Sequence, residues 1–270
     1  MPEMELNGAR LHFSVSGIGP ETVVFAHGLL WDHHMFDPQI AALQDRYRCI
    51  AVDFRGQGRS EVTAGGYDMD TLTADLVALI ETLGCAPCHF VGLSMGGFVG
   101  LRLAARHPQL VRSLTLLATS ADAEPADSRR RYRLLRGIVR WLGVRPVLGR
   151  VMCIMFGAAF LSDPARADER HAHRARLVGI DKRGAALAAG GVIDREPVLD
   201  ELRAIRCPVL ILHGDQDQAI AQQRAQQLHA RLRDSRMELL PETGHTPTLE
   251  CPQRVNSYLR AFLLRLDRKD

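Results

Sequence analysis

The stretch CHFVGLSMGG, residues 88–97, decides the fold. It runs from a short apolar segment through Ser94 into a segment of helical periodicity, and Gly92 and Gly96 stand two residues to either side of the serine. A residue at the centre of so sharp a strand-to-helix turn has a strained backbone, and only small neighbours avoid a clash with it. Such a turn lifts the hydroxyl clear of a sheet, so Ser94 is predicted to be a nucleophile that a substrate can reach.

The composition is that of an ordinary globular chain. Its 270 residues are 46% hydrophobic and 24% charged, and 34 basic against 31 acidic residues leave a formal charge of +3. This balance favours neither nucleic acid nor an anionic membrane as a partner. The first residues lack the pattern of a signal peptide, and the longest apolar run, residues 151–161, is too short to span a membrane. We expect a cytoplasmic protein with a small-molecule partner, and the sequence carries no indication of its oligomeric state.

Two fragments have spacings found in metal sites. Cys85 and Cys88 form a CxxC pair without a second pair, and His171 and His173 lie in an arginine-rich helical stretch without matching carboxylate or cysteine ligands. The six cysteines are therefore expected to be reduced thiols, and neither a metal nor an organic cofactor is predicted.

Short apolar segments alternate with segments of helical periodicity along most of the chain. Strands are predicted at residues 11–15, 22–26, 49–52, 89–93, 114–118, 209–213 and 237–240, and helices at residues 38–46, 70–83, 95–106, 219–232 and 252–266. Several of the strand segments are continuously apolar, as strands buried on both faces must be. The pattern predicts a mostly parallel α/β sheet covered by helices on both faces, with the functional loops at the carboxyl ends of the strands.

The alternation breaks between residues 121 and 202, where helical stretches such as 128–142 and 165–179 dominate. We therefore predict a core made of residues 1–120 and 203–270 and a helical insertion made of residues 121–202. An arginine cluster within residues 129–140 could attract an anionic substrate. It could equally be the solvated face of an amphipathic helix whose apolar side is Leu134, Leu135, Ile138 and Val139.

Acyl transfer by a serine requires a base, a carboxylate that orients the base, and donors for the developing oxyanion. His245 is the predicted base, because it alone among the 11 histidines follows a glycine in a loop after the last predicted strand. Asp217 is the predicted carboxylate. Asp215 is the alternative, although it directly follows Gly214 and would lie in a turn, where an aspartate often bonds its own backbone.

The oxyanion hole is predicted from two backbone N–H groups. One belongs to Met95, which follows the nucleophile and opens a helix whose dipole favours negative charge. The other belongs to Leu29 in the loop after an earlier strand, where Gly28 allows close backbone approach.

Two further groups of residues are predicted near the substrate. The apolar side chains Val147, Met152, Met155 and Phe156 would form a roof over the pocket, or would only seat the insertion on the core. His33 and His34 would line the mouth of the pocket. In the alternative interpretation, the neighbouring Asp32 simply caps the following helix.

With these residues in view, the chain resembles the α/β-hydrolase superfamily with a helical cap. The matching motifs are the His27-Gly28 turn, DFRGQGRS at 53–60, the turn at Ser94, GDQD at 214–217, and Gly244-His245 followed by LECP at 249–252. The resemblance covers nearly the full chain. It implies an eight-stranded sheet, a Ser94–Asp217–His245 triad and a cap over the pocket. Residues 53–60 together with GLSMGG at 92–97 are similar in particular to 3-oxoadipate enol-lactonases and small carboxylesterases.

The sequence thus predicts a serine hydrolase that cleaves a carboxylic ester or lactone through an acyl-enzyme. A serine at residue 94, where epoxide-opening and halide-removing relatives hold an aspartate, argues against those two reactions. Three alternatives stay open: cleavage of a carbon–carbon bond in a meta-cleavage product, perhydrolysis by the same triad, and ligand binding on the same scaffold.

Overall fold

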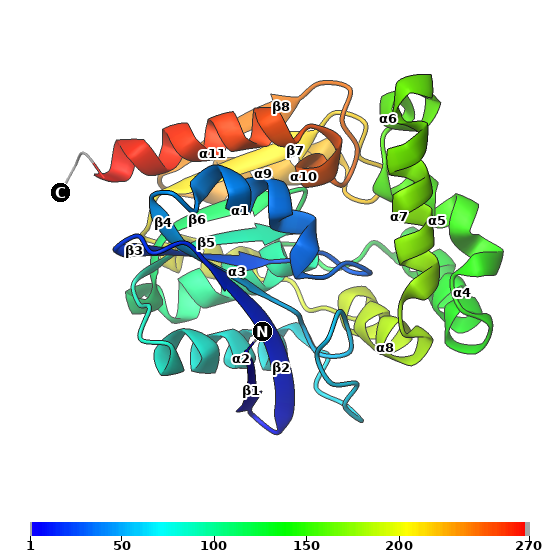
Figure 1. The fold of residues 1–270 in the computed structure, drawn as a ribbon, viewed down its shortest axis with the longest axis horizontal. Coiled ribbons are helices and arrows are strands. Elements are labelled where there is room, and N and C mark those ends of the chain that lie inside the picture. The colour runs from blue at the N-terminus through cyan, green and yellow to red at the C-terminus, as the bar shows by residue number, and fades with distance from the viewer. Residues whose placement is uncertain (1, 268–270) are drawn as a thin grey trace.

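The computed structural model describes residues 2–267, and its centre is an eight-stranded sheet in the order β1-β2-β4-β3-β5-β6-β7-β8 (Figure 1). The strands are β1 (Glu3–Leu6), β2 (Ala9–Ser16), β3 (Glu21–Ala26), β4 (Tyr47–Val52), β5 (Cys88–Leu93), β6 (Val111–Leu117), β7 (Val209–Gly214) and β8 (Ser235–Leu240). The pairs β1–β2 and β2–β4 are antiparallel, and the other five pairs are parallel. The expected α/β fold with a mostly parallel sheet is therefore confirmed.

Five helices cover the two faces of this sheet. They are α1 (Asp37–Leu43), α2 (Met69–Thr82), α3 (Met95–Arg106), α9 (Gln222–Arg231) and α11 (Pro252–Asp267). All seven strands and five helices that the alternation predicted are present, and their ends lie within three residues of the predicted ones.

Successive residues of the central strands enter two separate cores. In β3, Val24 and Ala26 pack with residues of α2, α3 and α9, whereas Val23 and Phe25 pack with residues of α1 and α11. Side chains alternate between the faces of a strand, so both sets must be apolar when helices cover both faces. This double burial explains why the central strands appear in the sequence as continuous apolar runs.

One strand, β1, is not predicted from the sequence. β1 has the sequence EMEL, and of its four residues only Leu6 is buried. It is paired on one side only, with β2, at the edge of the sheet. A strand this short and this charged has no apolar run to reveal it.

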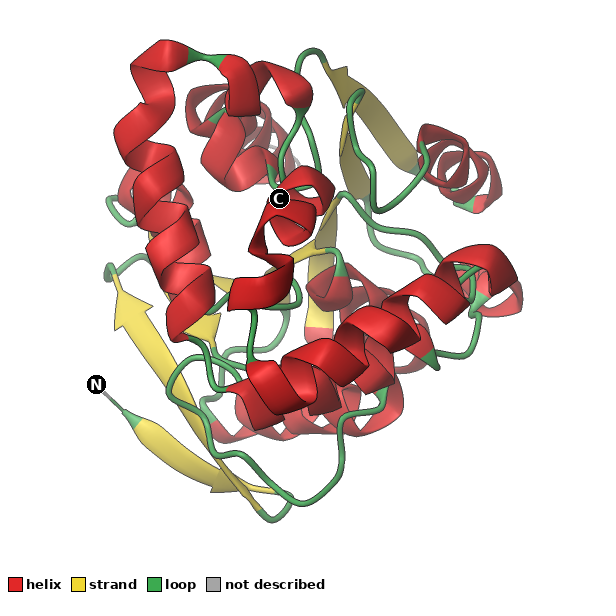
Figure 2. Cartoon of the chain, turned by 90° about the vertical axis from the view of Figure 1, so that its right-hand side faces the viewer, coloured by secondary structure: helices red, strands yellow, loops and turns green. Residues whose placement is uncertain are grey.

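Between β6 and β7 the chain forms helices joined by loops, without a strand. They are α4 (Ala126–Leu142), α5 (Leu148–Met155), α6 (Ala158–Ser162), α7 (Ala167–Gly179) and α8 (Lys182–Ile193), and we call residues 126–193 the helical segment. Figure 1 shows these green helices gathered beyond one end of the sheet, and Figure 2 shows them in front of it when that end faces the viewer. The remaining helix is α10 (Pro247–Glu250), and short 3-10 segments cover His33–Phe36, Pro108–Leu110, Arg145–Val147, Pro164–Arg166 and Leu199–Ala204.

Within residues 2–267, no helix combines the length and the apolar character that crossing a membrane requires.

The first turn of α3 lies in close contact with the central strands. A Cβ atom on Gly96 would stand 2.0 Å from the carbonyl oxygen of Ala26, and one on Gly92 would stand 2.4 Å from the carbonyl oxygen of Gly96. The Gly96 amide donates a hydrogen bond to the carbonyl of His27 at 3.1 Å, which joins α3 to the loop after β3. The two glycines thus permit the backbone contact on which the turn depends.

We predict that Gly96→Ala lowers the free energy of unfolding by about 3 kcal/mol or more, because the new methyl group overlaps backbone atoms that cannot rotate away. Urea denaturation measures the change. Gly137→Ala is the matched control: Gly137 lies on an exposed part of α4 with open space at its Cβ, and alanine there should stabilise the protein by about 0.5–1 kcal/mol. An unchanged unfolding midpoint for Gly96→Ala would contradict the packing argument.

Candidate active site

Ser94 stands between β5 and α3 in a conformation that L-residues rarely adopt, with φ 51° and ψ −108°. Hydrogen bonds on both sides hold it there. Its amide donates to the carbonyl of Leu117 at 2.8 Å, and its carbonyl accepts from the amide of Phe98 and the hydroxyl of Thr119, each at 2.9 Å. The strained turn that the glycine pattern predicts is therefore present, and the surrounding structure maintains the strain.

His245 connects Ser94 to a carboxylate. Its Nε2 lies 2.9 Å from the Ser94 hydroxyl oxygen, and its Nδ1 lies 2.9 Å from Oδ2 of Asp217. An imidazole that carries its proton on Nδ1 donates to the carboxylate and leaves Nε2 free to accept the serine proton. The arrangement can therefore remove a proton from Ser94 and hold the histidine in the tautomer that does so.

Asp217 and Asp215, the two candidates for the carboxylate, have different surroundings in the structure. The side chain of Asp217 is fully buried, and its Oδ1 accepts hydrogen bonds from the amides of Ala219 and Ile220 at 2.8 and 2.9 Å. Asp215 is exposed, and its carboxylate instead accepts from the amide of Thr243 at 3.2 Å. Asp217 is thus the aspartate that lies beside His245.

The amides of Leu29 and Met95 have no hydrogen-bond acceptor among the described residues, while their neighbours do. The Gly28 amide contacts the sulfur of Met35 at 3.4 Å, and the Leu30 amide donates to the side-chain oxygen of Gln57 at 2.8 Å. Leu29 borders the same cavity as Ser94, and Met95 directly follows Ser94 at the start of α3. The two amides are available to an oxygen atom of a bound ligand.

A buried carboxylate supports the loop that carries Leu29. Asp53, directly after β4, accepts hydrogen bonds from the amide of His33 at 2.7 Å, the ring of His33 at 2.9 Å, the ring of His12 at 3.0 Å and the amide of Arg59 at 2.9 Å. Next to it, Nε2 of His27 accepts from the amide of Phe54 at 3.0 Å. His12, His33 and Asp53 also bring three potential metal ligands within 4.8 Å of one another, but the two Asp53 oxygens already accept these four donors.

The structure corrects the prediction that His33 and His34 line the pocket. The ring of His33 is buried against Asp53, and the half-exposed ring of His34 lies 2.9 Å from the carboxylate of Asp37. The alternative interpretation describes this loop better. The side chain of Asp32 accepts from the His34 amide at 2.9 Å and caps the 3-10 segment, and it also pairs with Arg176 of α7.

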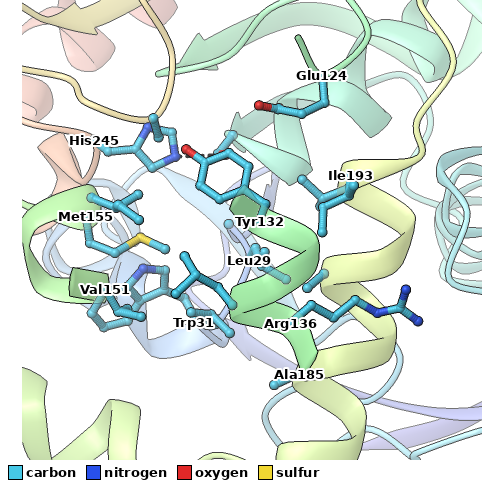
Figure 3. A pocket seen from close by; sticks show the side chains of 18 of the residues that line it. Leu29, Trp31, Glu124, Tyr132, Arg136, Val151, Met155, Ala185, Ile193 and His245 are labelled. Atoms are coloured by element: carbon cyan, nitrogen blue, oxygen red, sulfur yellow. Dashed lines mark hydrogen bonds between the residues drawn. The ribbon is translucent and has the colours of Figure 1, made fainter. Parts of the chain in front are cut away.

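A cavity lies between Ser94 and the helical segment (Figure 3). Its wall is mostly apolar and combines core residues with residues of α4, α5 and α8, among them Leu29, Trp31, Leu93, Phe98, Leu135, Val139, Val151, Ile154, Met155, Ala185 and Ile193. Apart from Ser94 and His245, the polar side chains on the wall are Glu124, Tyr132, Arg136 and Arg195. The site can therefore hold a largely apolar molecule against the serine.

The helix α5 both lines this cavity and seats the helical segment on the core. Met155 lies on the wall as predicted, whereas Val147, Met152 and Phe156 do not. The ring of Phe156 stacks on His173 at 5.1 Å and on Phe160 at 4.6 Å between centroids, and meets Trp31 edge-on at 6.0 Å. These three predicted roof residues are therefore packing residues, because they face other side chains of the protein rather than the cavity.

The arginines of α4 are held mainly by the protein itself. Arg133 pairs with Asp194 at 2.7 Å, Arg129 donates to the carbonyl of Glu124, and Arg136 donates to the carbonyl of Ala186. The exposed pair of Arg133 fits the interpretation as the solvated face of an amphipathic helix, whereas Arg136 also borders the cavity. One predicted member of the apolar side is misplaced, since Leu134 is 68% exposed.

Sequence reasoning missed the contribution of Glu250. This glutamate is 6% exposed and accepts hydrogen bonds from the amides of Gly244 at 2.9 Å and Thr246 at 3.0 Å, the two residues that flank His245. It also accepts from the amide of Gly157 at 2.8 Å. Glu250 thus fixes the backbone around His245 and ties it to the helical segment. In the sequence it was visible only as part of the LECP motif at 249–252.

Residues 21–252 match the family model of the alpha/beta hydrolase fold, so the chain belongs to the α/β-hydrolase family. It is 28% identical to 3-oxoadipate enol-lactonase 2 of Acinetobacter baylyi over 91% of this chain and 89% of that protein. An esterase from Thermogutta terrifontis has a TM-score of 0.89 at 26% identity, with 98% of each chain covered. The enol-lactonase from Burkholderia xenovorans has a TM-score of 0.90 at 27% identity and covers 97% of this chain and 100% of its own. Family and neighbours together support a hydrolase.

We predict that Glu250→Ala lowers both stability and activity. The substitution leaves three buried amides without an acceptor, and each such loss costs about 1–3 kcal/mol. Without this support His245 should be less well placed, and we expect kcat to fall by about 10-fold or more. Urea denaturation and initial rates measure the two effects. The exposed Gln253→Ala, three residues further on, is the control, and wild-type values for Glu250→Ala would refute the assignment.

The buried histidines and Asp53 predict a loss of stability in acid. Burial lowers the pKa of His27, and although burial alone would raise the pKa of Asp53, hydrogen bonds from His33 and the Arg59 amide lower it. In both cases the folded-state pKa lies below the unfolded one, so protons bind the unfolded chain more strongly and stability falls as the pH decreases.

We therefore expect the free energy of unfolding to decline below about pH 6.5 and to decline further below about pH 4, as first histidine and then aspartate becomes protonated in the unfolded chain. Urea titrations between pH 7.5 and 3.5 test this. A His27→Gln variant should show a smaller decline between pH 7 and pH 5 than the wild-type protein. Stability that stays constant or rises toward pH 5 would contradict the prediction.

Proposed function

We propose that the protein is a serine hydrolase that cleaves a carboxylic ester or lactone, with Ser94, Asp217 and His245 as its catalytic triad. The observation that carries this proposal is the continuous hydrogen-bonded chain from the Ser94 hydroxyl through both ring nitrogens of His245 to the carboxylate of Asp217. This chain ends at an apolar cavity that a small molecule can fill. The names of the relatives, an esterase and two enol-lactonases, support the same bond type.

In the proposed mechanism, His245 removes the proton from Ser94 as the serine oxygen attacks the substrate carbonyl carbon. The amides of Leu29 and Met95 donate to the oxyanion that forms. His245 then gives its proton to the leaving alcohol oxygen, and the acyl group stays on Ser94. Water, deprotonated by His245, attacks the acyl carbon, and the carboxylic acid leaves as Ser94 regains its proton. Asp217 stabilises the imidazolium and holds the tautomer throughout.

We further propose that residues 121–202 form a cap that selects the substrate. Its helices contribute the wall of the cavity opposite Ser94, and most of the side chains on that wall are apolar. An apolar wall favours an acyl or alcohol group with little charge, because a charged group would lose its water without gaining a partner.

Ser94→Ala should abolish hydrolysis of short nitrophenyl esters and simple lactones, because no other group replaces the attacking oxygen. Asp217→Asn should lower kcat by about 10⁴-fold, because the amide stabilises the wrong tautomer of His245. Asp215→Asn is the matched control and should stay near the wild-type rate, since Asp215 lies on the surface and its carboxylate accepts from the Thr243 amide rather than lying beside His245.

The measurements are initial rates and the stoichiometry of nitrophenol released in the first turnover. Hydrolysis by Ser94→Ala at the wild-type rate would overturn the proposal, as would a rate for Asp215→Asn that falls as far as that of Asp217→Asn. Product analysis on a ring-fission substrate separates ester cleavage from carbon–carbon cleavage, because only the latter divides the carbon chain.

A further inference from the structure

Arg195 borders the cavity and carries a buried guanidinium, one nitrogen of which has no partner among the described residues. Only 1% of its side chain is exposed. Its Nε donates to the carbonyl of Asp122 at 3.0 Å, and its Nη1 donates to the carboxylate of Glu124 at 2.9 Å and to the carbonyl of Val192 at 2.8 Å. Its Nη2 is buried and has no hydrogen-bond acceptor within the described part of the chain. The wall has a second buried donor without an acceptor, Nε1 of Trp31. Of the two, the Arg195 nitrogen is charged, and hydrogen bonds to charged groups contribute more than neutral ones, so it has more to gain from a ligand oxygen.

Arg195 and Ser94 border the same cavity. The guanidinium carbon lies 4.2 Å from the ring centroid of Phe98, and Phe98 itself lines the cavity. Phe98 lies in the first turn of α3, its amide donates to the carbonyl of Ser94 at 2.9 Å, and both residues border the cavity. A molecule bound in this cavity at Ser94 therefore has Phe98 and Arg195 on the surrounding wall.

The charge of Arg195 is already balanced by a buried carboxylate. Glu124 is 5% exposed, pairs with Arg195 through Oε2, and accepts a hydrogen bond from the hydroxyl of Ser128 through Oε1. The other guanidinium on the wall, that of Arg136, points away from His245 in Figure 3 and donates to the carbonyl of Ala186. A carboxylate bound at Arg195 would compete with Glu124 and leave a buried negative charge without its own partner, whereas a neutral oxygen needs only the free N–H.

We propose that Arg195 and Glu124 form a subsite for a second, uncharged hydrogen-bond acceptor of the substrate, such as a ketone or ether oxygen on the acyl chain. The proposal rests on the proposed function, because it assumes that the ester carbonyl is held at Ser94. It narrows the substrate class from any apolar ester to esters or lactones that carry a neutral polar oxygen a few bonds from the reacting carbonyl.

Three methyl esters of closely similar shape test the subsite: methyl hexanoate, methyl 5-oxohexanoate and monomethyl glutarate. Calorimetric binding to the Ser94→Ala protein avoids turnover, so this measurement does not depend on hydrolysis. We expect the ketone to bind about 10-fold more tightly than methyl hexanoate, the usual gain from a hydrogen bond to a charged donor, and the carboxylate to bind more weakly than the ketone. A shorter set, methyl pentanoate, methyl 4-oxopentanoate and monomethyl succinate, covers a second distance from Ser94.

The variant that removes the subsite is Arg195→Met combined with Glu124→Gln in the Ser94→Ala protein, since loss of the arginine alone would leave a buried unpaired carboxylate. We expect the ratio of ketone to alkane affinity to fall to about one, and the ratio within one preparation is insensitive to partial loss of folded protein. Arg136→Met is the matched control and should keep the ratio. Equal affinity for ketone and alkane in both sets, preference for the carboxylate, or a ratio that survives the double substitution would each overturn the proposal.

The same esters separate this inference from the proposed function. If the protein with Ser94 intact hydrolyses methyl hexanoate and the Ser94→Ala protein does not, the proposed serine chemistry holds whatever the affinity ratios are. If the affinity ratios are as expected but hydrolysis does not depend on Ser94, the subsite stands and the proposed chemistry fails.

Discussion

The close approach of the first turn of α3 to the central strands is the constraint on which the rest of the structure depends. Gly92 and Gly96 permit it because neither carries a Cβ that would meet the backbone opposite. The approach forces Ser94 into a left-handed conformation with φ 51°, which directs its hydroxyl into the cavity and leaves the Met95 amide at the start of the helix. His245 and Leu29 follow other strands of the sheet. Without that turn, the Ser94 hydroxyl would not lie beside His245 and in the cavity that Leu29 borders.

Three buried carboxylates hold the backbone around that serine, and each does so by accepting amide hydrogen bonds. Asp53 secures the loop after β3 through the amide and ring of His33, Asp217 closes the turn at residues 219–220, and Glu250 binds the amides on both sides of His245. A carboxylate can accept several N–H groups at once, so one side chain can fix two or more points of a loop. Such support holds the groups of a site in place before a ligand binds.

The helical segment divides its side chains between two tasks. Met155 faces the cavity, while Phe156, the next residue, stacks on His173 and holds the segment against Trp31 of the core. Glu124 and Arg195 form an ion pair on a mostly apolar wall, at the two places where the chain enters and leaves the helices. The lining of the cavity and the attachment of the segment are thus carried out by neighbouring residues.

The sequence by itself determined seven of the eight strands, the strand-to-helix turn at residue 94 and the order of Ser94, Asp217 and His245. These features leave local marks: apolar runs, small residues around a tight turn, and polar residues just after a strand. Only the tertiary structure decided which side chains face the cavity, as the outcomes for His33 and Val147 show, since that depends on how each helix is rotated against its neighbours. It also decided the contribution of Glu250, because the carboxylate meets an amide 93 residues away in the chain, and no local pattern records a contact over that separation.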